Sequence, residues 1–325
     1  MTADPQDRPR LVVVLPMARR SLGIRDYTQR LAAALRESRR VDLREGPWWG
    51  APAADVLDVQ LGNSSRELIV PLLARRRAAR VFVTLHDVLA LDPRARLAWQ
   101  RVLRRVLRRR VDHVIVHSVA AQLLAVDSLG VTPDAVSIVA HGVTLHAVDR
   151  DAVRAAYGLP CDRPIIAVGG VLKLNKGVLE VIEATKSLAS EPVVLLAGEV
   201  ADPAIAAALR RASPQRLRHV RGLNDAALAE LLGAADLVVA VRRTDVGAAS
   251  GVAALARGAG VPVIEGPAEV VSLTRALAGA LASAEHLAGL RAQARAAAQA
   301  VTWAAVADLR VALYLRVLGE QGARR

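Results

Sequence analysis

Short apolar runs alternate with longer segments of helical periodicity along almost the whole chain. This alternation is typical of βαβ units, in which a helix connects two parallel strands. The predicted strands form two series, residues 11–15, 56–61, 80–85, 113–116 and 136–139, and then 165–168, 193–197, 219–221, 237–241 and 261–264. Each series begins with a strand and a glycine-containing turn. The pattern therefore predicts an α/β protein with two doubly wound domains, joined near residues 149–162.

The length of the chain supports the same division. A chain of 325 residues suits two domains of about 150 residues each. We expect an N-terminal domain over residues 1–150, a C-terminal domain over 151–300, and a terminal helix over 301–325 that packs back towards the N-terminal domain.

Composition narrows the class of partner and the compartment. Only 2% of residues are aromatic, which argues against nucleic acid bound by base stacking. The net charge of +13 favours an anionic partner such as a nucleotide sugar or an acidic lipid headgroup, although arginine spread along the chain also fits a coding bias. The single Cys161, a polar N-terminus and the lack of an apolar run of about 18 residues predict a cytoplasmic protein. The high apolar fraction leaves room for a homodimer.

Lysine is rare in this chain and is concentrated in one turn. Only three of the 44 Lys and Arg residues are lysines, and Lys173 and Lys176 both lie in the turn 169–177, after the apolar run 165–168. A strand, a glycine turn and a helix offer backbone N–H groups, a helix N-terminus and an ammonium group to a phosphate. The pattern predicts an anchor for a nucleotide diphosphate, with a turn that carries two solvated lysines as the alternative.

Candidate site residues directly follow the predicted strands, because ligands of parallel sheets bind beyond the carboxyl ends of the strands. In the first half they are Gly23, Asn63, His86, Asp87, His117, Ser118 and His141, and in the second Gly169, Gly170, Lys173, Lys176, Gly198, Glu199, Arg242, Ser250 and Gly251. Three of the seven histidines thus follow strands of one domain. A single histidine is more often a surface or core residue, so it is the coincidence that indicates a site.

Several other chemistries have no motif in the sequence. There is no cysteine cluster and no carboxylate-rich loop, so no metal site is predicted. A Gly-x-Ser-x-Gly elbow, a Walker lysine motif and a Gly-x-Gly-x-x-Gly fingerprint are also absent from the sequence. A two-domain nucleotide binder remains.

Nine short segments, in this order, resemble the retaining glycosyltransferases of family 4, which have the GT-B architecture of two facing Rossmann-like domains. The segments are 23–31, 60–64, 83–87, 114–118, 140–143, 176–177, 196–199, 234–237 and 260–263. They cover nearly the whole chain and are followed by Val-Thr-Trp at 301–303. The resemblance implies the GT-B fold.

The resemblance also implies a reaction. It is the transfer of a sugar from a nucleoside-diphosphate sugar to a sugar, lipid-linked or natural-product acceptor, with retention and without metal or cofactor. Residues 151–300 would hold the donor and residues 1–150 the acceptor. Lys176 would neutralise the departing diphosphate, and His86 matches the histidine that faces the donor sugar. The other candidates of the second half, with Gly23, would bind the donor, and Asn63, Asp87, His117, Ser118 and His141 would lie on the acceptor side.

Two departures from the family pattern concern the donor turn and a nearby connection. Gly170 stands where the family carries an arginine, which leaves Lys173 as the candidate replacement for that charge. The segment between residues 266 and 281 is shorter than in the family.

The third departure concerns two glutamates of the family that contact the donor sugar and its ribose. Ala248 and Leu255 stand near their positions, and Asp245 and Glu265 are the candidate substitutes. A hydrogen bond to a charged group contributes about 1.5–3 kcal/mol, so the loss of both would lower donor use roughly 10²–10⁴-fold. The alternative function is therefore a catalytically silent relative that binds a sugar nucleotide or a partner enzyme.

The segment 94–110 predicts a strongly basic amphipathic helix, with Trp99, Val102, Leu103 and Val106 on one side and arginines on the other. An ordinary surface helix whose apolar stripe packs on the sheet is the favoured interpretation. Peripheral contact with an anionic membrane on its inner face is the alternative, and it would go with a lipid-linked acceptor.

Overall fold

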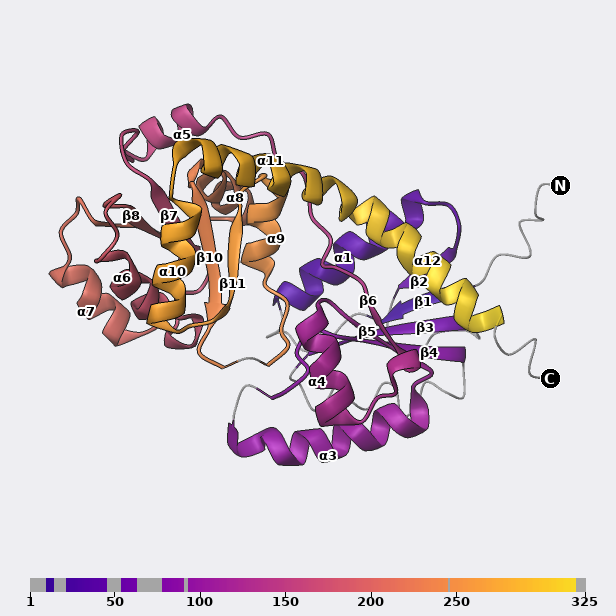
Figure 1. Cartoon of the computed structure of the whole chain (residues 1–325). Helices are drawn as coiled ribbons and strands as arrows, with labels where there is room; N and C mark the ends of the chain where they lie inside the picture. Colours follow the sequence, from indigo (N-terminus) through magenta and orange to yellow (C-terminus); the bar gives the residue numbers. More distant parts are fainter. Residues whose placement is uncertain are drawn as a thin grey trace. The chain divides into compact units, whose positions relative to one another are not determined.

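The computed structural model describes residues 10–14, 22–45, 54–62, 78–90, 93–244 and 246–319. The chain divides into two compact units (Figure 1). Unit 1 comprises Met1–Gly142, Val246–Ala249 and Trp303–Arg325, and unit 2 comprises Val143–Asp245 and Ser250–Thr302. The chain thus leaves unit 1 after Gly142, contributes the short segment Val246–Ala249 to it, and returns to it at Trp303. We had expected the boundaries at residues 150 and 301. At the boundary Val143 donates to the carbonyl oxygen of Val301 at 2.9 Å, so the outgoing and returning chains are paired there.

Unit 1 is built on a parallel sheet. Its six strands in the described part of the chain have the order β2-β1-β3-β4-β5-β6. They are β1 (Arg10–Val14), β2 (Asp42–Glu45), β3 (Ala54–Leu61), β4 (Ala78–Leu85), β5 (His113–Val116) and β6 (Val136–Ile138). The sequence did not reveal β2, because its residues Asp-Leu-Arg-Glu carry little apolar signal.

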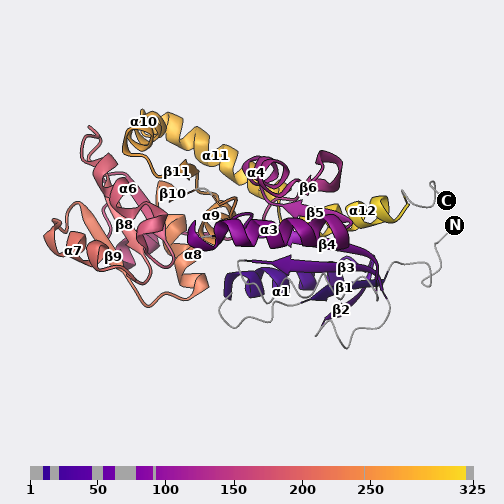
Figure 2. The same ribbon diagram turned by 90° about the horizontal axis from the view of Figure 1, so that it is seen from below.

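Helices cover both faces of this sheet. On one face α1 (Leu22–Glu37) and α12 (Trp303–Gly319) pack over a core that contains Val56, Phe82 and Ile115. On the other, α3 (Pro93–Arg110) and α4 (Val119–Leu129) pack over Leu57, Val83 and Val114. Helix α3 runs alongside the strands (Figure 2). Each fully buried Val, Leu, Ile or Phe side chain stabilises the unit by about 1.5–3 kcal/mol.

Strand β3 and its neighbour β4 carry buried polar residues on the face towards α1 and α12. Strand residues alternate between faces, and Asp58, Gln60 and Thr84 follow Val56 and Phe82 at alternate positions with at most 1% of their surface exposed. Buried polar groups need hydrogen-bonding partners. These partners come from distant parts of the chain, as shown below.

Unit 2 contains a second parallel sheet, whose five strands among the described residues have the order β11-β10-β7-β8-β9. They are β7 (Ile165–Gly169), β8 (Val193–Ala197), β9 (Leu217–Val220), β10 (Leu237–Arg242) and β11 (Val263–Pro267). All five overlap the predicted strands. In this order β7 and β10 are neighbours, so their carboxyl ends lie side by side at one edge of the sheet.

The helices of unit 2 also form two layers. They are α5 (Arg150–Ala156), α6 (Val178–Thr185), α7 (Pro203–Arg211), α8 (Asp225–Ala234), α9 (Gly251–Gly258), α10 (Val270–Ala280) and α11 (Ala284–Ala300). Helices α6, α7 and α10 share one core with Val168 and Val239, and α8 and α9 share another with Ala167 and Val238. Adjacent strand residues therefore enter opposite cores, as a sheet buried on both faces requires.

Side-chain chemistry sets several helix ends. Ser118 is the N-cap of α4, where its Oγ accepts from the N–H of Ala121 at 3.1 Å, and α4 ends at Gly130 with φ of 64°. Asn224 caps α8 in the same way. Such caps satisfy backbone groups that have no partner inside the helix.

Helix α3 confirms most of the predicted amphipathic pattern. Trp99, Leu103 and Val106 are buried, but Val102 is 50% exposed, so its assignment to the buried side was wrong. Residues 99, 103 and 106 repeat at helical spacing. Position 102 falls at one edge of that stripe, and the buried Leu107 lies at the other edge. None of the helices in the described residues is both long and apolar enough to cross a membrane.

Candidate functional site

The lysine turn of unit 2 lies at the carboxyl end of β7. Gly170 follows the strand with φ of 78°, and Gly177 precedes α6 with φ of 64°, both values that favour glycine. A short 3-10 helix, η4 (Leu174–Lys176), lies between them. Gly198, at the end of β8, packs so closely that a Cβ there would lie 2.1 Å from the carbonyl oxygen of Gly170. The two turns therefore form one compact surface of backbone groups.

Lys176 folds back over this turn. A Cβ added to Gly170 would lie 3.2 Å from its Nζ, so the ammonium group occupies space that a side chain at 170 would need. Burial, together with the nearby charges of Arg242 and Lys173, lowers the pKa of Lys176 to about 8. A cation held close to other cations is a place where an anion would be stabilised.

A small cavity, here called the basic hollow, joins the ends of β7 and β10 to the start of α9. Its polar lining consists of Gly169, Lys176, Arg242 and Ser250, and its volume is about 20 Å³. Ser250 is the N-cap of α9, and its Oγ accepts from the N–H of Ala253 at 3.2 Å. The hollow has room for about one water molecule, so a larger anion would bind at its rim.

The structure therefore brings together only part of the predicted donor set. Gly169, Lys176, Arg242 and Ser250 line the basic hollow, and Gly170, Gly198 and Gly251 adjoin its polar groups in the turns and at the first residue of α9. Lys173 is exposed but close enough to lower the pKa of Lys176. Glu199 is also exposed, and its carboxylate accepts from the N–H of Gly222 at 2.9 Å instead of lining the hollow.

Gly23 does not lie in a loop as predicted. It is the second residue of α1 in unit 1, and nothing lies within 4 Å of a Cβ placed there. The first turn of a helix leaves its N–H groups without partners inside the helix, so the local sequence is compatible with both loop and helix. The preceding residues 15–21 lie outside the described part of the chain, as does Asn63.

The positions of the missing glutamates are occupied by apolar packing. Ala248 packs against the unit 1 core that contains Val88, and Leu255 packs into a core of unit 2. Of the two candidate substitutes, Asp245 lies outside the described residues. Glu265 forms an ion pair with Arg257 and does not line the basic hollow.

The three predicted histidines come together in unit 1. His86, His117 and His141 follow β4, β5 and β6, and their rings surround Tyr27 with centroid distances of 4.6, 5.2 and 4.9 Å. Trp303, at the start of α12, lies 5.1 Å from the ring of Tyr27 and closes the group. We call His86, His117 and His141 the histidine cluster.

Two histidines of this cluster are held neutral. Burial lowers the pKa of His117 to about 3, assisted by the charge of His141, and lowers the pKa of His86 well below its usual value, assisted by His117 and His141. His117 donates from Nδ1 to the carbonyl oxygen of Val139 at 2.8 Å, so Nε2 carries the lone pair. That Nε2 is buried and has no hydrogen-bonding partner in the described structure. His117 therefore presents an acceptor rather than a proton.

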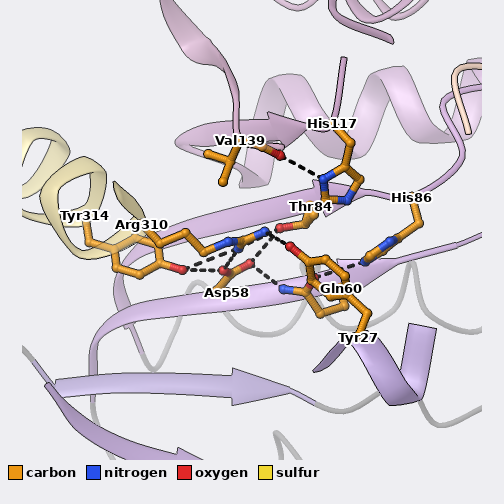
Figure 3. A network of polar contacts seen from close by, with 9 residues as sticks. All are labelled: Tyr27, Asp58, Gln60, Thr84, His86, His117, Val139, Arg310 and Tyr314. Carbon is orange, nitrogen blue, oxygen red and sulfur yellow. Dashed lines mark hydrogen bonds and ion pairs between the residues drawn. The ribbon is translucent and has the colours of Figure 1, made fainter. Parts of the chain in front are cut away.

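A buried ion pair adjoins the cluster, and sequence reasoning missed it. Arg310 of α12 pairs with Asp58 of β3, and both side chains are fully buried. Tyr27, Gln60, Thr84 and Tyr314 complete a group that we call the Arg310 network (Figure 3). A signal was present, because two polar residues at alternate positions of an otherwise apolar strand require a buried partner. That the partner is Arg310 could not be read from the sequence.

The remaining acceptor-side candidates are Ser118, Asp87 and the Nδ1 atom of His141. The Oγ of Ser118 is used as the cap of α4, and Asp87 is partly buried after β4. The Nδ1 of His141 is 2.8 Å from the carbonyl oxygen of Gly142. Among the described residues no group of three or more His, Cys, Asp or Glu side chains could hold a metal ion.

Comparison with known proteins gives the fold class. No family model matches the sequence, and no curated protein matches it significantly. Solved structures do match. One is HepE from Anabaena in complex with UDP-glucose, with 17% identity and a TM-score of 0.70 over 94% of this chain and 99% of HepE. Another is a sucrose-phosphate synthase from Thermosynechococcus elongatus, with 16% identity and a TM-score of 0.71 over 96% of this chain and 100% of that one. A glycosyltransferase from Rickettsia africae matches at 12% identity, with a TM-score of 0.70 over 96% of this chain and 99% of that one. The chain has the GT-B fold, with two Rossmann-like domains, as the sequence predicted.

Proposed function

We propose that this protein is a glycosyltransferase that moves a sugar from a nucleoside-diphosphate sugar to an acceptor. The observation that carries the proposal is the basic hollow, in which the Lys176 ammonium lies near Arg242 at the carboxyl edge of the unit 2 sheet. Several of the matched structures are glycosyltransferases, and HepE has been seen with UDP-glucose. The net charge of +13 suits an anionic donor.

The basic hollow accounts for the leaving group. As the bond between sugar and diphosphate breaks, negative charge grows on the diphosphate, and cations that are already in place stabilise it most in the transition state. Lys176, Arg242 and the N-terminus of α9 supply positive charge at the rim. We propose that these groups take the part that a divalent cation plays in other transferases, so that the reaction needs neither metal nor cofactor.

The histidine cluster accounts for the sugar side. We propose that His86 faces the donor sugar and that Asn63, Asp87, His117, Ser118 and His141 lie on the acceptor side. The depressed pKa values of His86 and His117 suit hydrogen bonding to hydroxyl groups, because a neutral imidazole both donates and accepts. Retention at the anomeric carbon belongs to the same proposal, and the product would show it by NMR.

We also propose that the reaction takes place in the cytoplasm, on a sugar, lipid-linked or natural-product acceptor, and that a lipid-linked acceptor would go with peripheral contact of α3 at the inner face of the membrane. Helix α3 supports this, since Arg101, Arg105 and Arg109 surround the half-exposed Val102 in a surface hollow of about 530 Å³. Co-sedimentation with liposomes should increase with the fraction of anionic lipid. Binding that ignores the lipid charge would favour a diffusible sugar or natural-product acceptor instead.

One observation favours a second candidate function. Ala248 and Leu255 pack into cores where the resembling family carries glutamates, so no carboxylate from these positions reaches the donor. The protein would then bind a sugar nucleotide or a partner enzyme without turnover. Binding of a nucleotide together with no transfer or hydrolysis, under every donor and acceptor tried, would support this candidate.

The chain offers a matched test of the proposal. UDP, GDP and ADP are screened by thermal shift, where a ligand at 100 times its dissociation constant stabilises by about 2.7 kcal/mol. The preferred nucleotide then identifies the donor sugars for transfer and hydrolysis assays. Lys176→Ala should lose most of the shift and the turnover, whereas Lys186→Ala, which removes a 65% exposed lysine, should keep both. No shift with any nucleotide would contradict the proposal.

A further inference from the structure

We propose that Arg310 of α12 is a positioning residue for His86, because through Asp58 and Gln60 it decides which ring nitrogen of His86 carries the proton. The link is a continuous row of buried polar groups, from the Arg310–Asp58 ion pair to Gln60 and on to His86 (Figure 3). Its importance for catalysis depends on the proposed function, whereas the positioning itself does not.

Asp58 begins the row with a carboxylate that can only accept. Its oxygens receive hydrogen bonds from Arg310, from the hydroxyl of Tyr314, from the hydroxyl of Thr84 at 3.1 Å and from Nε2 of Gln60 at 2.9 Å. Arg310 also donates to Thr84 at 3.0 Å, so the Thr84 hydroxyl accepts from one ion and donates to the other. Arg310 thus gives the buried carboxylate an ion-pair partner.

Gln60 links Asp58 to His86, because the carboxylate of Asp58 fixes the orientation of the Gln60 amide group. Its NH₂ group must face Asp58, because the amide oxygen would meet the carboxylate acceptor to acceptor. The amide oxygen Oε1 therefore faces His86, whose Nε2 lies 3.1 Å away. An acceptor at that distance requires a proton on Nε2. With the ring neutral, Nδ1 of His86 is left with the lone pair.

Arg310 controls a second contact of the same ring. Its other terminal nitrogen donates to the hydroxyl of Tyr27 at 2.9 Å, and the ring of Tyr27 lies edge-on to His86 with 4.6 Å between centroids. Arg310 thus fixes a hydrogen bond on one side of His86 and a packing surface on another. Both depend on a helix that lies far from His86 in the sequence.

The proposal makes His86 an acceptor at Nδ1 for a hydroxyl group of the sugar. A ring with the opposite tautomer would offer a donor at Nδ1, so the sugar hydroxyl would have to accept a hydrogen bond there instead of donating one. The tautomer of His86 therefore affects which sugar binds and how that sugar is oriented. Helix α12, from the far end of the chain, completes the site by supplying Arg310.

Long-range proton–nitrogen correlation spectra of the histidine rings test the proposal on the full chain, with His86→Gln to assign the resonance. Wild-type His86 should be protonated on Nε2 alone. Gln60→Leu should give a mixture of the two tautomers, and Gln60→Glu, which keeps an acceptor oxygen, should restore the Nε2 proton. The matched control is Thr28→Val, which removes another buried hydrogen bond of α1 and should leave the spectrum of His86 unchanged.

The role of Arg310 itself is tested without leaving a buried charge unpaired. Asp58→Leu with Arg310→Met replaces the ion pair by apolar side chains, a change that proteins often tolerate. Gln60 then loses the partner that orients its amide group. The two tautomers of His86 should therefore mix, although Gln60 and His86 themselves are unchanged. If this double variant does not fold, Gln60→Leu still decides the matter.

Transfer assays separate this proposal from the proposed function. Gln60→Leu should lower kcat about tenfold with little change in KM, and should add nothing to the loss caused by His86→Gln. A His86 tautomer that stays on Nε2 in Gln60→Leu and in the double variant, or that lies on Nδ1 in the wild type, overturns the positioning role. If no donor is turned over, the proposed function fails, and the spectra still test the positioning.

Discussion

At the scale of single residues, the turn after β7 shows why one position cannot hold the arginine of the family pattern that the sequence resembles. Gly170 has φ of 78°, and a Cβ there would lie 3.0 Å from Val252 and 3.2 Å from the Nζ of Lys176. An arginine would need both the left-handed backbone and the volume that the ammonium group fills. The arginine of the family pattern and this position of Lys176 therefore exclude one another.

This crowding predicts the effect of Gly170→Ala. Alanine at a positive φ destabilises by about 1 kcal/mol, and the contact with Nζ should also move Lys176 and weaken nucleotide binding about tenfold. Gly222→Ala is the matched control, since Gly222 has φ of 72° and nothing within 4 Å of a Cβ. Chemical unfolding and nucleotide titration of both variants measure the difference. Equal nucleotide affinity in the two would show that Nζ is not part of the site.

The lowered pKa of Lys176 predicts a pH dependence of nucleotide binding. The side chain is a cation below about pH 8 and loses its charge as the pH rises through that value. The diphosphate of ADP or UDP stays ionised there, so nucleotide affinity should fall about tenfold between pH 7 and 9, by calorimetry. Lys176→Met should bind weakly and show a flat profile. A wild-type profile that is flat over this range would contradict the assignment of Lys176.

The same pKa has a consequence for stability, with the opposite sign. The unfolded lysine titrates near 10.5 and the folded one near 8, so between these values the unfolded state binds more protons. The free energy of unfolding should therefore rise with pH over this window. In Lys176→Met this contribution should disappear.

At the scale of secondary-structure elements, the strands were predictable and the groups at their ends only partly so. Apolar runs identified β7 and β10 because a strand buried on both faces has few polar residues. Strand β2 was not predicted, because its sequence Asp-Leu-Arg-Glu is polar. Sequence order alone could not show that Ala248 and Leu255, seven residues apart, pack into different cores.

The start of α9 carries a prediction of its own. Ser250 caps the helix and lines the basic hollow, so Ser250→Ala should cost about 1 kcal/mol of stability and also weaken nucleotide binding. Ser283 caps α11 in the same manner, with its Oγ 3.0 Å from the N–H of His286. Ser283→Ala should therefore have a similar cost without a change in affinity. Thermal unfolding and titration compare the two variants, and a loss of affinity in both would point to a general effect.

At the scale of the whole molecule, the two ends of the chain build one unit. Helix α12 packs with α1 over Phe82 and Val139 and sends Arg310 into the sheet. The histidine cluster therefore rests on residues from both ends of the chain. Such contacts close a long loop between Gly142 and Trp303, which costs loop-closure entropy.

A truncated chain tests this dependence. Without residues 303–325, unit 1 would expose the apolar face covered by α12 and leave Asp58 buried without its partner. Amide protons of β3 and β4 should then lose most of their protection in hydrogen exchange. Removal of residues 320–325 alone, beyond the end of α12, is the control and should leave protection as in the full chain. Full protection of β3 and β4 in the longer truncation would refute the role of α12.

The sequence by itself determined the α/β class, the repetition of a doubly wound unit, the lysine turn and the placing of three histidines at strand ends. It could do so because strand burial and glycine turns are local properties, and because parallel strands end at the same edge of a sheet. Only the tertiary structure decided that Lys176 folds over Gly170, that Ser250 shares its hollow, and that Arg310 reaches Asp58. The last two contacts join residues far apart in the chain, and no local pattern records which distant side chain will satisfy a buried charge.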